Sequence, residues 1–426
     1  MKRQKAYQWS RLDNAAKIFP PSSTPQDPKV FRFACELREE VQPDALQTAL
    51  DQTLEQFPFY RSVLKKGLFW YYLEATDQRP LVTPENLPPC SMLYQGEGRD
   101  LLFRVNWYRK RINLEVFHAL ADGTGALNFL RMMVYHYLLL VHAPEMGEER
   151  PAIDYDASGP QKVDDSFVKY FGPGDRTKLD RGPQAFHLRG DRLADCALSI
   201  IEGEIQVEPL LAAAKARGTT LTVFLAAVLV QAIHTQMSVQ DERRPVVISV
   251  PVNLRNYFPS ATARNFFTVL NVGYDFSKGS GMLEDIIQKF DADLRKNLTK
   301  DALAHRLNKL ASLEHTMLLR LIPLFIKIPA LKISHWLAAR EVTAAFSNIG
   351  PVQMPQPMRP YIRLFDAFLS TRRMQAVMAS FEGRFLITFT APFVSTEVQR
   401  NFFRILSEMG LEATITSNYL DVEGVN

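Results

Sequence analysis

Alternating and helical patterns of apolar residues divide the first part of the chain into strands and helices. Residues 30–37 and 67–75 are rich in aromatic and aliphatic side chains and predict strands, whereas residues 43–57 have helical spacing. Residues 101–120 alternate apolar and polar positions on both sides of a basic turn at 109–111, and this pattern predicts a β-hairpin. The first part of the chain is therefore expected to mix strands with helices.

A similar mixture returns after residue 200. A helix is predicted from Gly123 onward, and Gly218 is expected to end a later one because glycine often follows a helix C-terminus. A hairpin turn is expected at Glu382 and Gly383. The elements predicted after residue 200 are helices over 209–218 and 220–236, strands over 244–255 and 266–276, a long helix over 281–313, a hairpin over 374–393 and a helix that Ser395 opens.

Residues 143–195 have neither pattern and are rich in Pro, Gly and Asp. We interpret them as a crossover between an N-terminal half, residues 1–180, and a C-terminal half, residues 190–426. A chain of 426 residues is long for one hydrophobic core, so each half is expected to bury its own. Because each half mixes helices with antiparallel hairpins, the predicted fold class is α+β.

Composition and charge remove several classes of function. Hydrophobic residues make up 46% and charged residues 23%, which is typical of a soluble globular protein. The 50 basic and 46 acidic residues nearly balance, and no basic tract is interleaved with aromatics, so nucleic acid is not an expected partner. The odd number of widely spaced cysteines predicts neither a disulfide framework nor a metal site and favours a reducing cytoplasm. They are Cys35, Cys90 and Cys196.

Familiar catalytic motifs are missing from the sequence. It contains no H-E-x-x-H, no G-x-S-x-G and no G-x-x-x-x-G-K-[ST], which argues against a zincin protease, a serine hydrolase with a nucleophile elbow and a P-loop nucleotidase. The first 17 residues are basic but are not followed by an apolar segment, so a secretory signal is not predicted.

The clearest candidate for chemistry is His118. It ends the second predicted strand of the hairpin, and Asp122 and Gly123 follow four and five residues later, where a helix is predicted to begin. An imidazole with an ordinary pKa of about 6.5 suits general-base catalysis near neutral pH. The same residues also fit a structural interpretation, in which the histidine ends a strand and the aspartate caps a helix. The residues alone leave both interpretations open.

The segment HALADG, residues 118–123, resembles the H-x-x-x-D-G signature of a large acyltransferase superfamily. It includes chloramphenicol acetyltransferase, the condensation domains of nonribosomal peptide synthetases, the plant BAHD acyltransferases, the mycobacterial polyketide-associated acyltransferases and the fungal alcohol acetyltransferases. VPVNLRNYFP (250–259) followed by NFFTVLNV (265–272) resembles a condensation-domain stretch, and FSNIGPV (346–352) resembles a strand of alcohol-acetyltransferase-like members. The three segments occur in order and span nearly the whole chain.

Two departures narrow the resemblance. Condensation domains usually carry two adjacent histidines, whereas Phe117 occupies the first of these positions here. This favours the free-standing acyltransferases, in which one histidine suffices, and the alcohol acetyltransferases in particular. The D-F-G-W-G motif of the plant enzymes is absent, which argues against that branch.

The resemblance implies a fold and a set of site residues. The fold would be two chloramphenicol-acetyltransferase-like α/β sandwich halves with a channel between them. His118 would be the general base, and Asp122 would be structural and pair with Arg255. Donors to the oxyanion of the tetrahedral intermediate would come from Ser347, Asn348 or the amide of Gly123. No metal is implied.

The resemblance also implies the substrates. The donor would be an acyl thioester, either acyl-coenzyme A, which we favour, or an acyl carrier protein, and no cofactor would be permanently bound. The acceptor would be a small-molecule or lipid-like alcohol or amine, and the protein is expected to be a monomer. Two alternatives stay open: a condensation-type enzyme that depends on a carrier protein, and a non-catalytic binding protein that keeps the fold.

Residues 315–340 contain no acid and are interrupted by Pro323 and Pro329. The prolines and the basic residues argue against a membrane-spanning helix. One interpretation is an amphipathic helix pair that contacts a membrane or grips a lipid. The other is a core helix of the C-terminal half whose basic residues point outward.

Overall fold

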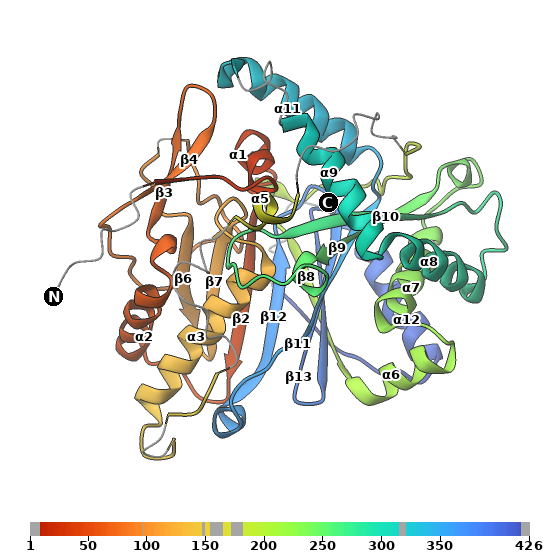
Figure 1. The fold of residues 1–426 in the computed structure, drawn as a ribbon. Helices are drawn as coiled ribbons and strands as arrows, with labels where there is room; N and C mark the ends of the chain where they lie inside the picture. Colours follow the sequence, from red (N-terminus) through yellow and green to blue (C-terminus); the bar gives the residue numbers. More distant parts are fainter. Residues whose placement is uncertain are drawn as a thin grey trace.

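Helices and strands form two layered halves that lie side by side (Figure 1). The structure is a computed structural model that describes residues 9–96, 98–146, 150–153, 165–171, 182–314 and 321–418. Each half has a β-sheet with helices packed against it, so the predicted α+β class is confirmed.

A five-stranded sheet forms the centre of the N-terminal half. Its strands, in spatial order, are β12 (Ile362–Leu369), β2 (Val30–Leu37), β7 (Arg111–Phe117), β6 (Phe103–Tyr108) and β5 (Thr83–Pro84). All neighbouring pairs are antiparallel except β5 with β6. The predicted hairpin over 101–120 is present as β6 and β7, and Arg109 adopts a positive φ in its turn.

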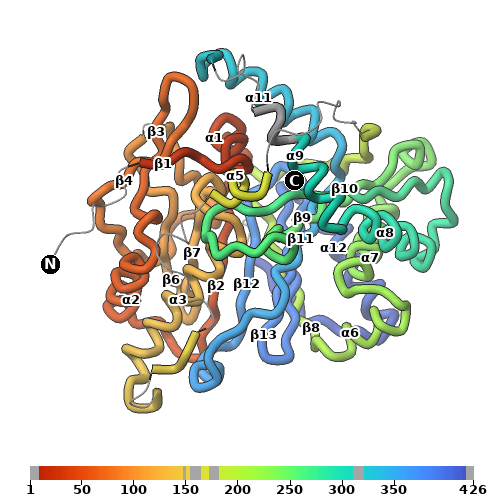
Figure 2. Tube along the Cα trace, viewed as in Figure 1, coloured from red at the N-terminus to blue at the C-terminus, as the bar shows by residue number. Residues whose placement is uncertain are grey.

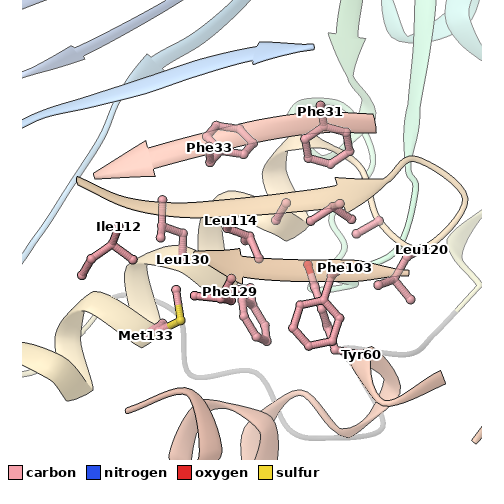
Figure 3. Packing of buried hydrophobic residues seen from close by; sticks show 14 of the residues in the cluster. Phe31, Phe33, Tyr60, Phe103, Ile112, Leu114, Leu120, Phe129, Leu130 and Met133 are labelled. Atoms are coloured by element: carbon pink, nitrogen blue, oxygen red, sulfur yellow. The ribbon is translucent and has the colours of Figure 1, made fainter. Parts of the chain in front are cut away.

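Helices α2 (Pro43–Gln56) and α3 (Gly123–Val141) pack on this half (Figure 1). Figure 3 shows α3 directing Phe129, Leu130 and Met133 toward the strands. The Phe129 ring stacks on Tyr60 with centroids 4.0 Å apart, and Phe103 of β6 meets Phe129 edge-on. Burial of such large aromatic side chains is the main source of stability for this half.

A small sheet lies at one end of the N-terminal half. It contains β1 (Trp9–Arg11), β4 (Tyr71–Ala75) and β3 (Ser62–Lys66) in that order. The strand predicted over 67–75 begins only at Tyr71, because residues 67–70 form the turn from β3. The apolar pattern did not separate the turn from the strand, since Leu68, Phe69 and Trp70 are as apolar as the strand itself.

The C-terminal half is built on a seven-stranded sheet. Its strands, in spatial order, are β10 (Phe267–Tyr274), β9 (Val246–Asn253), β11 (Ala344–Pro351), β13 (Met374–Phe381), β14 (Arg384–Ala391), β8 (Ser199–Gln206) and β15 (Thr414–Ser417). The helices on this half are α6 (Val207–Ala216), α7 (Leu221–His234), α8 (Leu283–Asn297) and α12 (Glu397–Glu408). The predicted turn at Glu382 and Gly383 joins β13 to β14, and both residues have positive φ.

The long helix predicted over 281–313 is wrong in its continuity. The structure has two helices there, α8 and α9 (Lys300–Glu314), with a break at Leu298 and Thr299. The hydroxyl of Thr299 accepts a hydrogen bond from the amide of Ala302 at 3.2 Å. Thr299 therefore caps the N-terminus of a new helix, α9. The apolar pattern does not show the break, because it continues from one helix into the next.

Strand β12 connects the two halves. It belongs by sequence to residues 190–426 but pairs antiparallel with β2, with Phe365 opposite Cys35. The predicted crossover, residues 143–195, includes the short helix α5 (Ser166–Tyr170). Residues 147–149, 154–164 and 172–181 of the crossover lie outside the described residues.

Helix α11 (Leu324–Ala339) lies at the edge of the molecule, near the short helix α1 (Phe19–Ser22) (Figure 1, Figure 2). The interpretation of residues 315–340 as a core helix with outward basic residues is wrong for the described part, residues 321–340. Phe325 and Trp336 are 65% and 58% exposed, whereas Lys327 is buried. Because Leu324 is buried on the opposite side, α11 is apolar on both sides, and helical spacing alone does not reveal which side packing leaves exposed.

The remaining short elements are 3-10 turns. They are η1 (Ala16–Ile18), η2 (Pro58–Tyr60), η3 (Ala194–Cys196), η4 (Asp241–Arg243), η5 (Leu254–Asn256) and η6 (Gln356–Tyr361). Among the described residues, no single helix is long and apolar enough to cross a membrane, although the bent pair α6 and α7 passes the same test of length and composition together.

Candidate active site

His118 lies where the two halves meet. It follows the last residue of β7, and its amide donates a hydrogen bond to the carbonyl of Lys29 at 2.9 Å. The imidazole stacks on Phe19 with centroids 4.3 Å apart and contacts Phe31 at 5.0 Å. Phe267 of β10, from the C-terminal half, packs at 5.3 Å. The ring is thus held by aromatic side chains of both halves, while His118 keeps part of its surface exposed.

A polar chain behind the imidazole defines which nitrogen carries the proton. Nδ1 of His118 lies 3.2 Å from Oδ1 of Asn265, and Nδ2 of Asn265 donates to Oδ2 of Asp13 at 3.3 Å. Because the amide nitrogen is directed at a carboxylate, the amide oxygen faces the histidine. Nδ1 must then carry the hydrogen, which leaves the lone pair on Nε2.

Asp13 anchors this chain in the N-terminal segment. Its carboxylate accepts the amide of Ala16 at 2.8 Å and lies 3.7 Å from the guanidinium of Arg264. Burial raises the pKa of Asp13 to about 6, although Arg264 opposes the shift. The group is therefore mostly ionised at pH 7 and remains an acceptor for Asn265.

Burial also sets the charge of the imidazole. It lowers the pKa of His118 from 6.5, and the charge of Lys29 acts in the same direction. Asp122 and Asn265 raise the pKa but do not overcome burial. The neutral form therefore predominates at pH 7, and a neutral imidazole with a free Nε2 can accept a proton.

Asp122 and Arg255 form an ion pair across the halves. Nη1 of Arg255 donates to Oδ2 of Asp122 at 2.8 Å, and Nη2 lies 3.3 Å from Oδ1. The same carboxylate accepts the amides of Gly125 and Phe266 at 2.9 and 2.8 Å. Asp122 is 3% exposed, and its described hydrogen-bond partners are Arg255 and these two amides rather than His118. Its hydrogen bonds hold the start of α3 against residues 255–266.

Gly125 has a role that the sequence did not reveal. A Cβ atom at this position would lie 1.9 Å from the carbonyl oxygen of Ala263, so only glycine permits this close approach. Gly123 begins α3, where helical geometry gives its amide no acceptor within the helix. A Cβ at Gly123 would make ordinary contacts with Ile349 and Phe33.

Ser347 and Asn348 lie on β11, next to Ile349. The side-chain Nδ2 of Asn348 donates to the hydroxyl of Thr222 at 2.9 Å, and its Oδ1 accepts the backbone amide of Gly350 at 2.8 Å. These contacts tie Asn348 to the start of α7 and to its own strand rather than to His118. Among the described contacts, none joins Ser347 or Asn348 to the imidazole.

Sequence reasoning missed Asp13, Phe19 and Asn265. The N-terminal segment has no periodic pattern, and its residues reach His118 only through tertiary contacts. Asn265 is the first residue of the segment NFFTVLNV (265–272), but nothing in the sequence indicates that its side-chain amide contacts His118. The only sequence signal for these contacts is the presence of an aspartate, Asp13, and an aromatic residue, Phe19, in an N-terminal segment without a periodic pattern.

The described residues show no group of three or more His, Cys, Asp or Glu side chains that could hold a metal ion. Cys35 and Cys90 are buried and Cys196 is exposed, and all three are free thiols. Burial raises the pKa of the Cys35 and Cys90 thiols well above 9.0, so neither is an activated nucleophile.

Comparison of the sequence with protein-family models and with curated proteins finds no match. Solved structures match over most of their length. Polyketide synthase associated protein 5 from Mycobacterium tuberculosis is 16% identical, with a TM-score of 0.59 over 93% of this chain and 96% of that one. TRI101 from Fusarium sporotrichioides, complexed with coenzyme A and T-2, is 11% identical, with a TM-score of 0.63 over 96% and 100% of the two chains. The first condensation domain of the CDA synthetase is 13% identical, with a TM-score of 0.62 over 95% and 97%.

Identities this low establish the fold and not the activity. They agree with the independent signal from the sequence, in which HALADG, the segment around Arg255 and FSNIGPV occur in order. The resemblance inferred from those motifs is confirmed at the level of fold. The chain therefore has the chloramphenicol-acetyltransferase-like fold shared by condensation domains and TRI101.

Proposed function

We propose that this protein is an acyltransferase that moves an acyl group from a thioester to a hydroxyl or amine, with His118 as the general base. The observation that carries the proposal is the state of that imidazole. It is neutral, partly accessible and at the junction of the halves, and its Nδ1 is held by Asn265 so that Nε2 is the basic nitrogen. A positioned base of this kind typically contributes about 10²–10⁴-fold to the rate.

The proposed reaction balances without a further reactant. Nε2 of His118 accepts the proton of the acceptor hydroxyl or amine as the acceptor atom attacks the thioester carbonyl. The tetrahedral intermediate then collapses, the carbon–sulfur bond breaks, and the imidazolium returns the proton to the departing thiolate. No covalent enzyme intermediate is needed.

The remaining predicted site residues take supporting roles in this proposal. The Asp122–Arg255 pair fixes the start of α3 and with it the His118 loop. The amide of Gly123, at the helix N-terminus, is the donor we favour for the oxyanion. Ser347 is the second candidate, whereas the existing contacts of Asn348 suit a structural role.

We favour acyl-coenzyme A as the donor and a small or lipid-like alcohol or amine as the acceptor. Solved structures of the same fold were determined with coenzyme A, with T-2 and, for a starter condensation domain, with C8-CoA. This supports a thioester donor without fixing the acyl chain. We further propose that the protein is a monomer. We also propose that it is cytoplasmic, because free thiols such as those of Cys35, Cys90 and Cys196 are usual in a reducing compartment.

A carrier-protein donor is the second candidate, because condensation domains are among the matching structures. A carrier loaded with an acyl group would then be turned over, whereas free coenzyme A thioesters would not. The two donors can be compared directly at equal thioester concentration.

The test is release of free thiol from acyl-coenzyme A of several chain lengths, with a panel of alcohols and amines. We expect turnover that His118→Ala lowers by about 10²–10⁴-fold. His234→Ala is the matched control, because this ring also stacks on a phenylalanine, Phe276, but lies on α7. Turnover unchanged by His118→Ala would refute the role of His118 as the base, whereas ligand binding without acyl transfer from either donor would favour a non-catalytic protein.

A further inference from the structure

An exposed apolar surface joins α11 to the turn between β3 and β4. We call it the α11 face. Its side chains are all between 37% and 72% exposed, and such a large apolar group on one surface usually marks an interaction site. The α11 face consists of Leu68, Phe69, Leu321, Phe325, Ile326, Ile333 and Trp336.

Hydrogen bonds make these two segments one surface. The amide of Leu324 donates to the carbonyl of Leu68 at 2.7 Å, and Nζ of Lys327 donates to the carbonyl of Phe69 at 3.2 Å. The same ammonium lies 3.7 Å from the centroid of the Trp70 ring. Figure 1 and Figure 2 show α11 and the β3–β4 turn at the same edge of the molecule.

Apolar side chains lie on both sides of α11: Leu324 is buried and Ile328 packs against the core, whereas a second apolar group is exposed. Its inner side contains Lys327, which is 8% exposed, and His335, whose ring lies 3.4 Å from Nζ of Lys29. Its outer side presents Phe325 and Trp336 to solvent. Exposed apolar side chains and a buried lysine are both unfavourable for a surface that contacts only water. The arrangement therefore indicates that the outer side of α11 has a partner.

The charges around the α11 face select its partner. Lys66 and Lys332 are exposed beside the apolar side chains, and the guanidinium of Arg340 lies 4.9 Å from the Trp336 ring. No acid occurs from residue 315 to 340. Two copies of this face would bring like charges together, whereas an anionic lipid surface satisfies both the apolar side chains and the cations.

We propose that the α11 face binds the interface of an anionic lipid bilayer, with the apolar side chains inserted among the acyl chains and the cations at the headgroups. Tryptophan beside lysine or arginine is typical of this interface. The contact between His335 and Lys29 links α11 to the residue whose carbonyl accepts the amide of His118. If the proposed acyl transfer also holds, a lipid-like acceptor or acyl chain would be taken from that surface.

Vesicle co-sedimentation of the full chain tests the proposal. The probes are vesicles of phosphatidylcholine alone and of phosphatidylcholine mixed with phosphatidylserine. We expect binding mainly to the mixed vesicles, and we expect the triple variant F325S/I333S/W336S to lower the affinity by more than about tenfold. K66E/K332E should remove the preference for phosphatidylserine.

A matched control removes three exposed apolar side chains from the C-terminal half. L211S/V239S/M282S should bind vesicles like the wild type, since these residues lie outside the α11 face. All variants replace exposed side chains, so their thermal midpoints should agree with that of the wild type. His118→Ala should also bind normally, which separates lipid binding from catalysis.

Three results would overturn the proposal. The first is no binding to the mixed vesicles, and the second is equal loss of binding in the α11-face variant and the matched control. The third is a wild-type dimer in sedimentation velocity that F325S/I333S/W336S abolishes, because the α11 face would then be a contact between copies.

Discussion

The two ends of strand β7 place their own side chains, Arg111 and His118, in opposite environments. At its start, Arg111 donates to both carboxylate oxygens of Glu202 at 2.6 and 2.8 Å and to Glu36 at 2.9 Å. At its end, His118 packs among phenylalanine rings, and its one described side-chain hydrogen-bond partner is the neutral amide of Asn265. The Arg111 side chain thus contacts carboxylates, whereas the His118 ring contacts aromatic side chains, with the Asp122–Arg255 ion pair nearby but not in contact with the ring.

Burial has opposite outcomes at the two ends because the partners differ. Burial disfavours the charged form of Arg111, but Glu202 and the other carboxylates outweigh it and raise the pKa. Burial lowers the pKa of His118, and within the described part of the chain no carboxylate lies close enough to the ring to reverse this. A group that exchanges a proton during a reaction needs an environment like that of His118, in which no ion pair fixes its charge.

The largest expected effect separates the two ends by function. His118→Ala should lower acyl transfer by about 10²–10⁴-fold with little change in the thermal midpoint, because the ring is partly exposed. Turnover and thermal unfolding of the same preparation provide the measurement. A large loss of stability with normal turnover would assign the histidine a purely structural role.

The next effect is on stability. Arg255→Met leaves the buried carboxylate of Asp122 without its cation, and Arg111→Met leaves the largely buried Glu202 without its own, so each should lower the free energy of unfolding by about 3–5 kcal/mol. Denaturant unfolding measures this loss. Arg400→Met is the control, because its pair with Glu397 is exposed and should contribute less than about 1 kcal/mol.

The two arginine variants should differ in activity. Arg255→Met releases the start of α3 beside His118, so turnover should fall as well as stability. Arg111→Met acts at the other end of β7 and should leave turnover per folded molecule unchanged. Equal losses of turnover would show that the two ends are not separate in function.

A smaller effect concerns the hydrogen bond behind the imidazole. Asn265→Ala should lower kcat by about tenfold, since loss of one hydrogen bond at an oriented group costs about 1–1.5 kcal/mol. Asp13→Asn allows the Asn265 amide to turn and should lower kcat in the same direction. Asn271→Ala, an exposed asparagine on β10, should have no effect on kcat.

The smallest expected effect is a pair of opposite shifts in the pH profile. Because the pKa of His118 lies below 6.5, kcat/KM should stay constant around neutrality and fall only as the pH drops below 6.5. Lys29→Met removes a charge that lowers this pKa, so the acidic limb should move toward neutral pH. Asn265→Ala removes a contact that raises it, so the limb should move to lower pH. Identical limbs in all three proteins would exclude His118 as the titrating base.

The sequence predicted the elements whose partners are close along the chain. The hairpins β6–β7 and β13–β14 and the helices α2, α3 and α7 follow local patterns that turn residues interrupt. Strand β12 was missed because its partner, β2, is more than 300 residues away in sequence. Unlike the strands of the hairpins, β12 has no paired strand next to it in the sequence that would mark it. The exposure of Phe325 and Trp336 was not predictable, since α11 is apolar on both sides and helical spacing does not indicate which side packs inward.

The same division applies to the candidate site. His118 and Asp122 are close in sequence and form a recognisable motif, and the resemblance supplied Arg255. Asp13, Phe19 and Asn265 contact the imidazole or its partner only after both halves have folded. Local sequence thus indicated the candidate base, and only tertiary structure revealed the residues that contact it.

The position of β12 has a consequence for how the chain is made. During synthesis the N-terminal half leaves the ribosome with one edge of β2 unpaired, and it stays so until residue 369 has emerged. An open edge of this kind attracts other strands, so a truncated product that ends near residue 180 should aggregate or recruit chaperones. The two halves therefore depend on each other for folding, and expression of the N-terminal half alone should require residues 362–369 to pair with β2.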